Sequence, residues 1–208
     1  MIVPLGRWVL RQACAQARLW QVNQRDGRPM YIAVNVSGHQ LAAGDLLPTV
    51  KDALAHAQLD PHWLALEITE SVILEEADSP IHALRELRAL GVHIGLDDFG
   101  TGYSSLSYLQ TLPLDAVKLD RSFISRLPED EVGRQIVGAI VQVARALSLS
   151  VVAEGVETED QLTCIRELGC HYVQGFYIAR PMTARQMTSA LNDPIWSRSR
   201  GVSHLTAR

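Results

Sequence analysis

This sequence of 208 residues has few cysteines, no excess of basic residues and no long apolar run. The three cysteines, Cys14, Cys164 and Cys170, have no metal-ligand spacing and are odd in number. We therefore expect free thiols in the core and a reducing compartment. With 19 basic and 23 acidic residues, the formal net charge is −4. This balance argues against nucleic-acid binding as the main function.

Targeting and membrane segments are not indicated either. The N-terminal stretch MIVPLGRWVLRQ places arginines inside its apolar part and has no small-residue cleavage site, so it is not typical of a signal peptide. No apolar run approaches the roughly 20 residues that a membrane helix requires. We expect a cytoplasmic protein without a membrane segment.

Short apolar strands alternate with amphipathic helices along most of the chain. A first helix is indicated by Val9, Ala13, Ala17 and Trp20, which recur at helical spacing. The predicted strands are 30–37, 64–69, 92–98, 115–120, 151–156 and 171–176. The helices predicted after them are 46–57, 79–90, 104–110, 131–147, 159–168 and 183–191. Because such apolar strands are covered on both faces, the pattern predicts a parallel sheet inside a layer of helices.

A residue capable of chemistry stands near the carboxyl end of each predicted strand. These residues are Asn35, Glu67, the pair Asp97 and Asp98, Lys118, Glu154 and Gln174. An open doubly wound sheet concentrates its chemistry at one switch point, whereas a barrel brings every strand end to one mouth. The sequence therefore favours an α/β fold of the TIM-like (β/α)8 barrel type, with about six of the eight strand–helix units present in residues 1–191.

The Asp97–Asp98 pair is the least ordinary of these features. A single Asn or Gln at a strand end usually bonds to a loop, and Lys118 has Asp115 and Asp120 as alternative salt-bridge partners. Two adjacent carboxylates after an apolar strand, however, cost several kcal/mol to bury unless cations compensate them. A strand-end turn can direct both of them to one site.

The strand-end residues together form a set rich in oxygen ligands. The candidate metal ligands are Asn35, Glu67, Asp97, Asp98 and Glu154. Hard oxygen ligands without His or Cys suit Mg²⁺ or Mn²⁺ rather than zinc, and a two-metal site favours in-line displacement at phosphorus. Lys118 could orient or deprotonate the attacking water, or balance charge on the phosphate.

A glycine-rich loop follows the aspartate pair. In FGTGYSSL, Gly100 and Gly102 flank Thr101, and the serines that follow offer a helix N-cap. The position of this segment, after two candidate ligands and before a helix, indicates a loop that covers the site.

Six strings, in this order and spacing, resemble the EAL family of bacterial phosphodiesterases, which linearise cyclic di-GMP. They are VNVSGHQL (34–41), LEITES (66–71), LDDFGTGYSSLSYL (96–109), VKLDRSFI (117–124), VVAEGVET (151–158) and VQGFYIARPM (173–182). The resemblance extends from about residue 2 to residue 191. It implies hydrolysis of one phosphodiester bond of cyclic di-GMP to linear pGpG with Mg²⁺ or Mn²⁺, and a homodimer contact on the helix after strand five.

The resemblance also implies roles for individual residues. Asn35, Glu67 and Asp97 match metal ligands, and Asp97 bridges to a second metal that is also held by Asp98, with Glu154 close by. By the same match, the catalytic groups are Lys118, which positions the attacking water, together with Asp98 and Glu154. Glu70 matches the residue that anchors the loop containing Gly100, Thr101 and Gly102, whereas Glu157 and Gln174 match supporting or substrate-proximal positions.

The sequence departs from the family pattern at its start. The family is named for a Glu-Ala-Leu signature, whose glutamate is a metal ligand and which is followed by a phosphate-binding arginine, and the 208 residues contain no such tripeptide. We expect a truncated barrel that lacks the first two strands, followed by a disordered tail at 192–208. The chain by itself is then expected to be a poor or inactive phosphodiesterase.

Two further functions remain open. A degenerate EAL module would bind cyclic di-GMP or a protein partner without catalysis, although such modules usually lose scattered ligands rather than one N-terminal block. Without the family argument, another metal-dependent barrel enzyme, such as a sugar-phosphate aldolase or an enolase-like protein, is a third possibility. That enzyme would have a lysine-centred site with fewer converging carboxylates.

Overall fold

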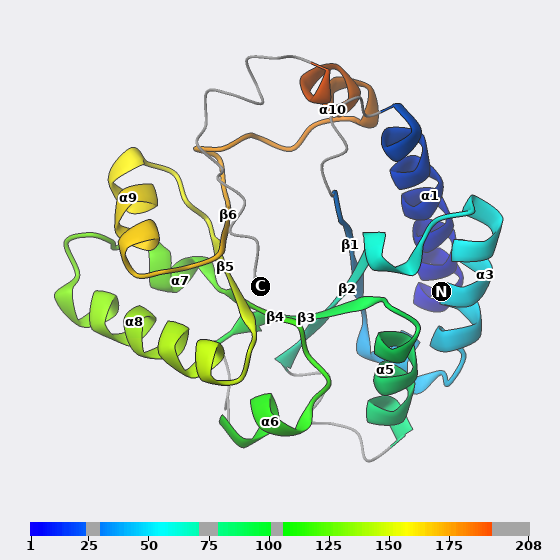
Figure 1. Cartoon of the computed structure of the whole chain (residues 1–208), viewed down its shortest axis with the longest axis horizontal. Helices are drawn as coiled ribbons and strands as arrows, with labels where there is room; N and C mark the ends of the chain where they lie inside the picture. Colours follow the sequence, from blue (N-terminus) through cyan, green and yellow to red (C-terminus); the bar gives the residue numbers. More distant parts are fainter. Residues whose placement is uncertain (24–29, 71–78, 101–105, 193–208) are drawn as a thin grey trace.

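The computed structural model describes residues 1–23, 30–70, 79–100 and 106–192 (Figure 1). Its strands are β1 (Ile32–Val36), β2 (Leu64–Thr69), β3 (His93–Phe99), β4 (Ala116–Leu119), β5 (Ser150–Glu154) and β6 (Tyr172–Gln174). They form one six-stranded sheet in the order β1-β2-β3-β4-β5-β6, and all neighbouring pairs are parallel. The prediction of six parallel strands in chain order is confirmed.

Helices surround this sheet on its outer side (Figure 1). They are α1 (Ile2–Asn23), α2 (Gly38–Ala42), α3 (Leu46–Ala57), α5 (Ser79–Ala89), α6 (Leu106–Thr111), α7 (Arg121–Ile124), α8 (Glu131–Ala146), α9 (Glu159–Glu167) and α10 (Ala184–Leu191), with a 3₁₀ turn η1 (Pro61–Trp63). Among the described residues, no helix is long and apolar enough to cross a membrane. The short elements α2, η1 and α7 were not predicted, because fewer than two turns show no usable periodicity.

Alternation of side chains along the strands, clearest in β2, separates the core from the site. In β2, Leu64, Leu66 and Ile68 are fully buried, whereas the residues between them are half-buried. Successive side chains of a strand point to opposite faces, so the leucine and isoleucine side chains meet the helices and Glu67 lies on the inner face. The helix-facing apolar residues of the other strands join the same core.

Three helices begin at the same sequence signal. Ser37, Thr158 and Thr183 each stand three residues before a glutamine, whose side-chain oxygen accepts the backbone N–H of the cap residue. At Thr158 and Thr183 the hydroxyl also accepts a backbone N–H of the first turn, which completes a capping box, whereas the Ser37 hydroxyl donates to Gln40 Oε1. These caps fix where α2, α9 and α10 start, directly after the loops that follow the carboxyl ends of β1, β5 and β6.

The cysteines lie in the core, as predicted. Cys14, Cys164 and Cys170 are all buried and unpaired. Burial raises the pKa of Cys14 to about 11 and that of Cys170 to about 12, so both remain thiols at neutral pH. They act as small apolar residues rather than as reactive groups.

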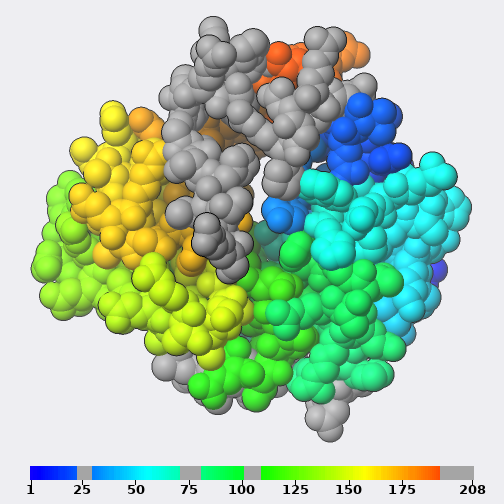
Figure 2. Space-filling model, viewed as in Figure 1, coloured from blue at the N-terminus to red at the C-terminus, as the bar shows by residue number. Residues whose placement is uncertain are grey.

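The ring of strands is open between β1 and β6. Each of these strands pairs with a single neighbour among the described residues, and the inner-face residues Ala33 and Asn35 of β1 are exposed. Outside the strands, the indole N–H of Trp20 on α1 donates to the hydroxyl of Thr188 on α10 at 2.9 Å. Figure 2 shows a hollow in the middle of the molecule, bordered by the N-terminal, blue part of the chain. The described part is therefore a partial (β/α)8 barrel, and the predicted tail lies outside it from residue 193 on.

The turn after β6 generates a stability prediction. A methyl group on Gly175 would lie 2.1 Å from the backbone carbonyl oxygen of Val156, and that backbone also bonds to Gln174 and Tyr177. We expect Gly175→Ala to lower the free energy of unfolding by about 3 kcal/mol, because the backbone has to move. The measurement is urea denaturation followed by circular dichroism.

Gly44→Ala is the matched control. Gly44 has a φ of +73° but nothing within 4 Å of an added Cβ, so only backbone strain applies. That strain costs about 1 kcal/mol. Equal losses in the two variants would contradict the close approach at Gly175.

Candidate metal and phosphodiester site

The polar strand ends meet on the inner face of the sheet. Asn35 and Glu67 are direct neighbours in the register of β1 and β2, and Glu154 and Gln174 are neighbours in β5 and β6. Between these pairs lie the aspartates of β3 and Lys118 of β4. The predicted convergence of strand ends is therefore present in the structure.

Lys118 is the centre of this arrangement. Its Nζ lies 2.8 Å from Glu67 Oε2, 3.0 Å from Asp97 Oδ1 and 2.6 Å from Glu154 Oε1. The lysine side chain is 7% exposed, so the ammonium is surrounded by carboxylates rather than by water. Burial alone would lower the pKa of Lys118, but its hydrogen bonds to Glu154, Glu67 and Asp97 outweigh burial and raise that pKa above its usual value. Lys118 is therefore an ammonium at neutral pH, which suits orientation and charge balance better than proton removal.

The alternative partners of Lys118 are used elsewhere. Asp115 accepts hydrogen bonds from Arg88 Nε at 3.0 Å and from the backbone N–H of Ile94 at 2.9 Å. Asp120 accepts from the backbone N–H of Ser122 at 2.9 Å and caps α7. The interpretation of Lys118 as an ordinary salt-bridge partner of Asp115 or Asp120 is therefore wrong.

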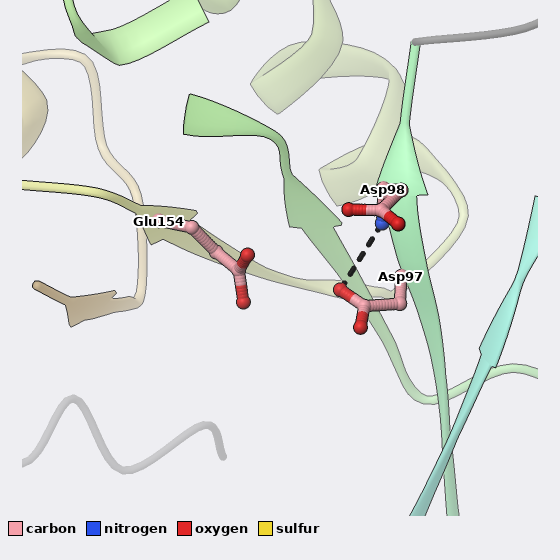
Figure 3. A group of neighbouring side chains, drawn as sticks. All are labelled: Asp97, Asp98 and Glu154. Atoms are coloured by element: carbon pink, nitrogen blue, oxygen red, sulfur yellow. Dashed lines mark hydrogen bonds between the residues drawn. The ribbon is translucent and has the colours of Figure 1, made fainter. Parts of the chain in front are cut away.

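A bulge in β3 brings two adjacent aspartates to one side. The register between β3 and β4 shifts between Leu96 and Phe99, and Asp98 has a φ of +53°. Both features interrupt the alternation that would otherwise send Asp97 and Asp98 to opposite faces. The Asp97 carboxylate accepts a hydrogen bond from the Asp98 backbone N–H at 3.1 Å, which holds the bend (Figure 3).

The oxygen ligands of three residues form a cluster with room for a cation. One carboxylate oxygen each from Asp97, Asp98 and Glu154 lie within 4.8 Å of one another. Figure 3 shows Glu154 extending from β5 toward the two aspartates of β3. Burial, then the neighbouring charges of Asp97 and Asp120, raise the pKa of Asp98. Burial raises the pKa of Glu154 as well, although Lys118 opposes this. The donor set consists of hard oxygen atoms, and the single ammonium of Lys118 offsets only part of its negative charge, which fits Mg²⁺ or Mn²⁺.

The supporting residues are placed less uniformly. Glu70 is buried directly after β2, and Gly100 follows β3 with a φ of +92°. Thr101 and Gly102 lie outside the described residues, so the predicted contact of Glu70 with that loop is not tested. Glu157 pairs with Arg121 at 2.9 Å, whereas Gln174 is exposed at the end of β6.

Two residues next to the site were missed from the sequence. Arg121 and Phe123 lie on α7, directly after the strand that contains Lys118, and both contact glycines of neighbouring loops. The signal that could have located α7 is Asp120 before a short polar–apolar segment, since Asp is a preferred N-cap residue. Their contacts depend on the fold and could not be derived from spacing.

Comparisons with known proteins identify the family. The family model for the EAL domain matches residues 1–181. The chain belongs to the EAL domain family. It is 47% identical over 193 residues to MucR of Pseudomonas aeruginosa, a bifunctional diguanylate cyclase/cyclic di-GMP phosphodiesterase, and the match covers 92% of this chain and 28% of MucR. NbdA, a cyclic di-GMP phosphodiesterase of the same species, is 44% identical over 182 residues, covering 88% of this chain and 23% of NbdA. The chain thus spans less than a third of the length of these relatives.

Solved structures of EAL proteins share the fold. The PaMucR phosphodiesterase in complex with c-di-GMP superposes with a TM-score of 0.83 at 47% identity, covering 89% of this chain and 74% of that chain. Klebsiella pneumoniae BlrP1 with manganese and cyclic di-GMP gives a TM-score of 0.74 at 27% identity, covering 88% of this chain and 45% of BlrP1. A calcium complex of BlrP1 is also known. The EAL domain is therefore of the TIM-like barrel type, as predicted, and its solved relatives include complexes with cyclic di-GMP and, for BlrP1, with manganese or calcium as well.

Removing the charge of Lys118 tests the carboxylate cluster. We expect Lys118→Met to lower the free energy of unfolding at pH 7.5, in the presence of a chelator, by about 3 kcal/mol, because three carboxylates lose their buried partner. Below pH 5 the loss should shrink, because burial raises the pKa of Glu154 and its carboxyl group then takes up a proton. Urea denaturation at both pH values measures the effect. The exposed Lys51 provides the control, since Lys51→Met should change the free energy of unfolding by less than about 0.5 kcal/mol. If the destabilisation in Lys118→Met did not depend on pH, the carboxylate cluster would not be its cause.

The raised pKa values of Asp98 and Glu154 predict pH-dependent metal binding. Metal ligands must be deprotonated, and a raised pKa means that these carboxylates gain protons at a higher pH than ordinary ones. Manganese affinity should therefore fall as the pH is lowered from 7 to 5. Isothermal titration with MnCl₂ measures this. A pH-independent affinity would show that Mn²⁺ binds elsewhere.

Proposed function

We propose that this EAL domain hydrolyses one phosphodiester bond of cyclic di-GMP to give linear pGpG, and that the reaction requires Mg²⁺ or Mn²⁺. The observation that supports this most directly is the convergence of Glu67, Asp97 and Glu154 on Lys118 at one mouth of the sheet. Such a concentration of carboxylates needs further positive charge, and a phosphodiester substrate that enters with divalent cations is consistent with that need. The names of the relatives MucR and NbdA indicate the same substrate.

The proposed ligands divide into two groups. Asn35, Glu67 and Asp97 would hold one cation, and Asp97, Asp98 and Glu154 the other. When bound, two such cations stabilise the negative charge that develops on the attacking and leaving oxygens. Both groups come from strands rather than loops, so the sheet itself holds them at a fixed spacing.

Lys118 would act as an orienting cation in this reaction. Its ammonium already donates to three acceptors, and the donation to any one of them can be exchanged for donation to water or phosphate oxygen. Glu157 is assigned a supporting role because its carboxylate pairs with Arg121. Gln174, exposed beside Glu154, is assigned a place next to the substrate. We place the reaction in the cytoplasm, which the three unpaired buried cysteines favour.

A binding function without hydrolysis is the second candidate. It is favoured by the open side of the sheet, where Asn35 is exposed and β1 has a neighbour on one side only among the described residues. A ligand group on an open edge is held less firmly than one inside a closed ring, and a misplacement of about 1 Å can cost a factor of roughly 100 in rate. An activity assay of the 208-residue chain by itself therefore distinguishes hydrolysis from binding without hydrolysis.

The assay incubates the chain with cyclic di-GMP and either MgCl₂ or MnCl₂, and separates pGpG by chromatography. Because the chain by itself is expected to be a poor phosphodiesterase, we expect slow, metal-dependent product formation that is abolished by chelator. In Asp97→Asn the kcat should fall by at least a further roughly 100-fold, because the variant removes a ligand charge while keeping the side-chain volume. Ca²⁺ should inhibit, since its larger and looser coordination suits a tight two-metal geometry poorly. Product formation without metal would contradict the proposal, whereas tight binding of cyclic di-GMP without product would establish the second candidate. Asp52→Asn, on the exposed surface of α3, is the control that should leave kcat unchanged.

A further inference from the structure

The four-residue helix α7 is fixed at both of its ends. Asp120 caps it by accepting the backbone N–H of Ser122 at 2.9 Å, and Ile124 at its other end is fully buried in the core. Lys118 is only two residues before the cap, on β4. The position of α7 is therefore coupled to the strand that supplies the ammonium of the site.

Two side chains of α7 lie against glycines with left-handed backbone. Gly100 follows β3 with a φ of +92°, and a Cβ there would lie 2.5 Å from both Cε2 and Cζ of the Phe123 ring. Gly155 follows β5 with a φ of +73°, and a Cβ there would lie 2.4 Å from Cγ of Arg121. Only a residue without a side chain allows such close contact. Each of the two loop backbones thus rests directly on a side chain of α7.

Both glycines are next to candidate ligands. Gly100 is two residues after Asp98, whose own φ of +53° is unfavourable for a residue with a side chain. A strained turn persists only when surrounding groups hold it, and the half-buried Phe123 ring is a bulky apolar group in contact with the end of this turn. On the other side, Arg121 adds an ion pair with Glu157 at 2.9 Å.

We propose that Phe123 is a positioning residue, which holds the Asp97–Asp98 turn so that both carboxylates face Glu154. Its ring lies against Gly100 at the end of the turn and has no oxygen or nitrogen that could ligate a cation, so it acts on metal binding through the geometry of the two aspartates. The effect of Phe123 on turnover rests on the proposed function. Its effects on metal binding and on the conformation of the turn do not, because neither requires hydrolysis.

The first experiment measures Mn²⁺ binding to the full chain by isothermal titration. Phe123→Ala should weaken binding by at least roughly tenfold, as for other residues that orient metal ligands, and Phe123→Leu should retain most of the affinity. The control is Trp63→Ala. Trp63 is a half-buried aromatic residue directly before β2, at the end of the sheet opposite to the site, so this variant should lose stability but not Mn²⁺ affinity. Equal affinity in Phe123→Ala and the wild type would overturn the proposal.

A double variant tests the contact itself. Gly100→Ala adds both backbone strain and a clash with the ring, and removal of the ring relieves only the clash. We therefore expect the double variant Gly100→Ala/Phe123→Ala to bind Mn²⁺ about fivefold more tightly than it would if the losses of affinity in the two single variants were independent. Additive losses would show that the ring and the turn act independently.

Hydrogen exchange separates this inference from the proposed function. In metal-free protein, the amides of Asp98 to Gly100 should exchange faster in Phe123→Ala than in the wild type, and Trp63→Ala should not have this effect. If the wild type bound no Mn²⁺ and formed no pGpG, the proposed function would fail, and faster exchange at the turn would still support the role of Phe123. Unchanged exchange at the turn in Phe123→Ala would refute that role whatever the activity.

Discussion

The interaction on which the site depends is the sharing of one buried ammonium by three carboxylates. Lys118 contacts Glu67, Asp97 and Glu154, which come from three other strands, so no local segment could form this cluster by itself. Three negative charges and one positive charge leave an excess of negative charge in a place that is largely shielded from water. The strands must therefore be held firmly against electrostatic repulsion, and the apolar contacts of the sheet with its helices supply that restraint.

Much of the fold could be predicted because its two periodicities are clear. The strands around Leu66 and Val117 are apolar and short, and a helix such as α8 has a well-defined buried side formed by Val137, Val141 and Ala144. The convergence of the strand ends followed from the rule that a barrel brings them to one mouth. The structure and the family match agree with this part of the prediction.

What could not be predicted depends on local geometry that has no sequence period. The bulge in β3 and the positive φ of Asp98 decide that two adjacent aspartates serve one site, yet an Asp–Asp pair by itself is equally compatible with regular alternation. Likewise, spacing suggested Asp115 and Asp120 as partners of Lys118, but both are used by groups nearby in space. Short elements such as α7 escape pattern recognition for the same reason, since one turn of helix contains too few residues to show which side is buried.

The same alternation that builds the core also assigns the chemistry. On β4, Val117 and Leu119 are fully buried, and Lys118 between them lies on the face where it meets the carboxylates. A slip of one residue in the register of this strand would turn Lys118 toward the helices and bring apolar side chains to the site. Both the loss of core contacts and the burial of an unpaired ammonium oppose that slip. The register that keeps Val117 and Leu119 in the core thus also keeps the ammonium of Lys118 among its carboxylates. One pairing register of β4 is therefore required both for a stable fold and for a formed site.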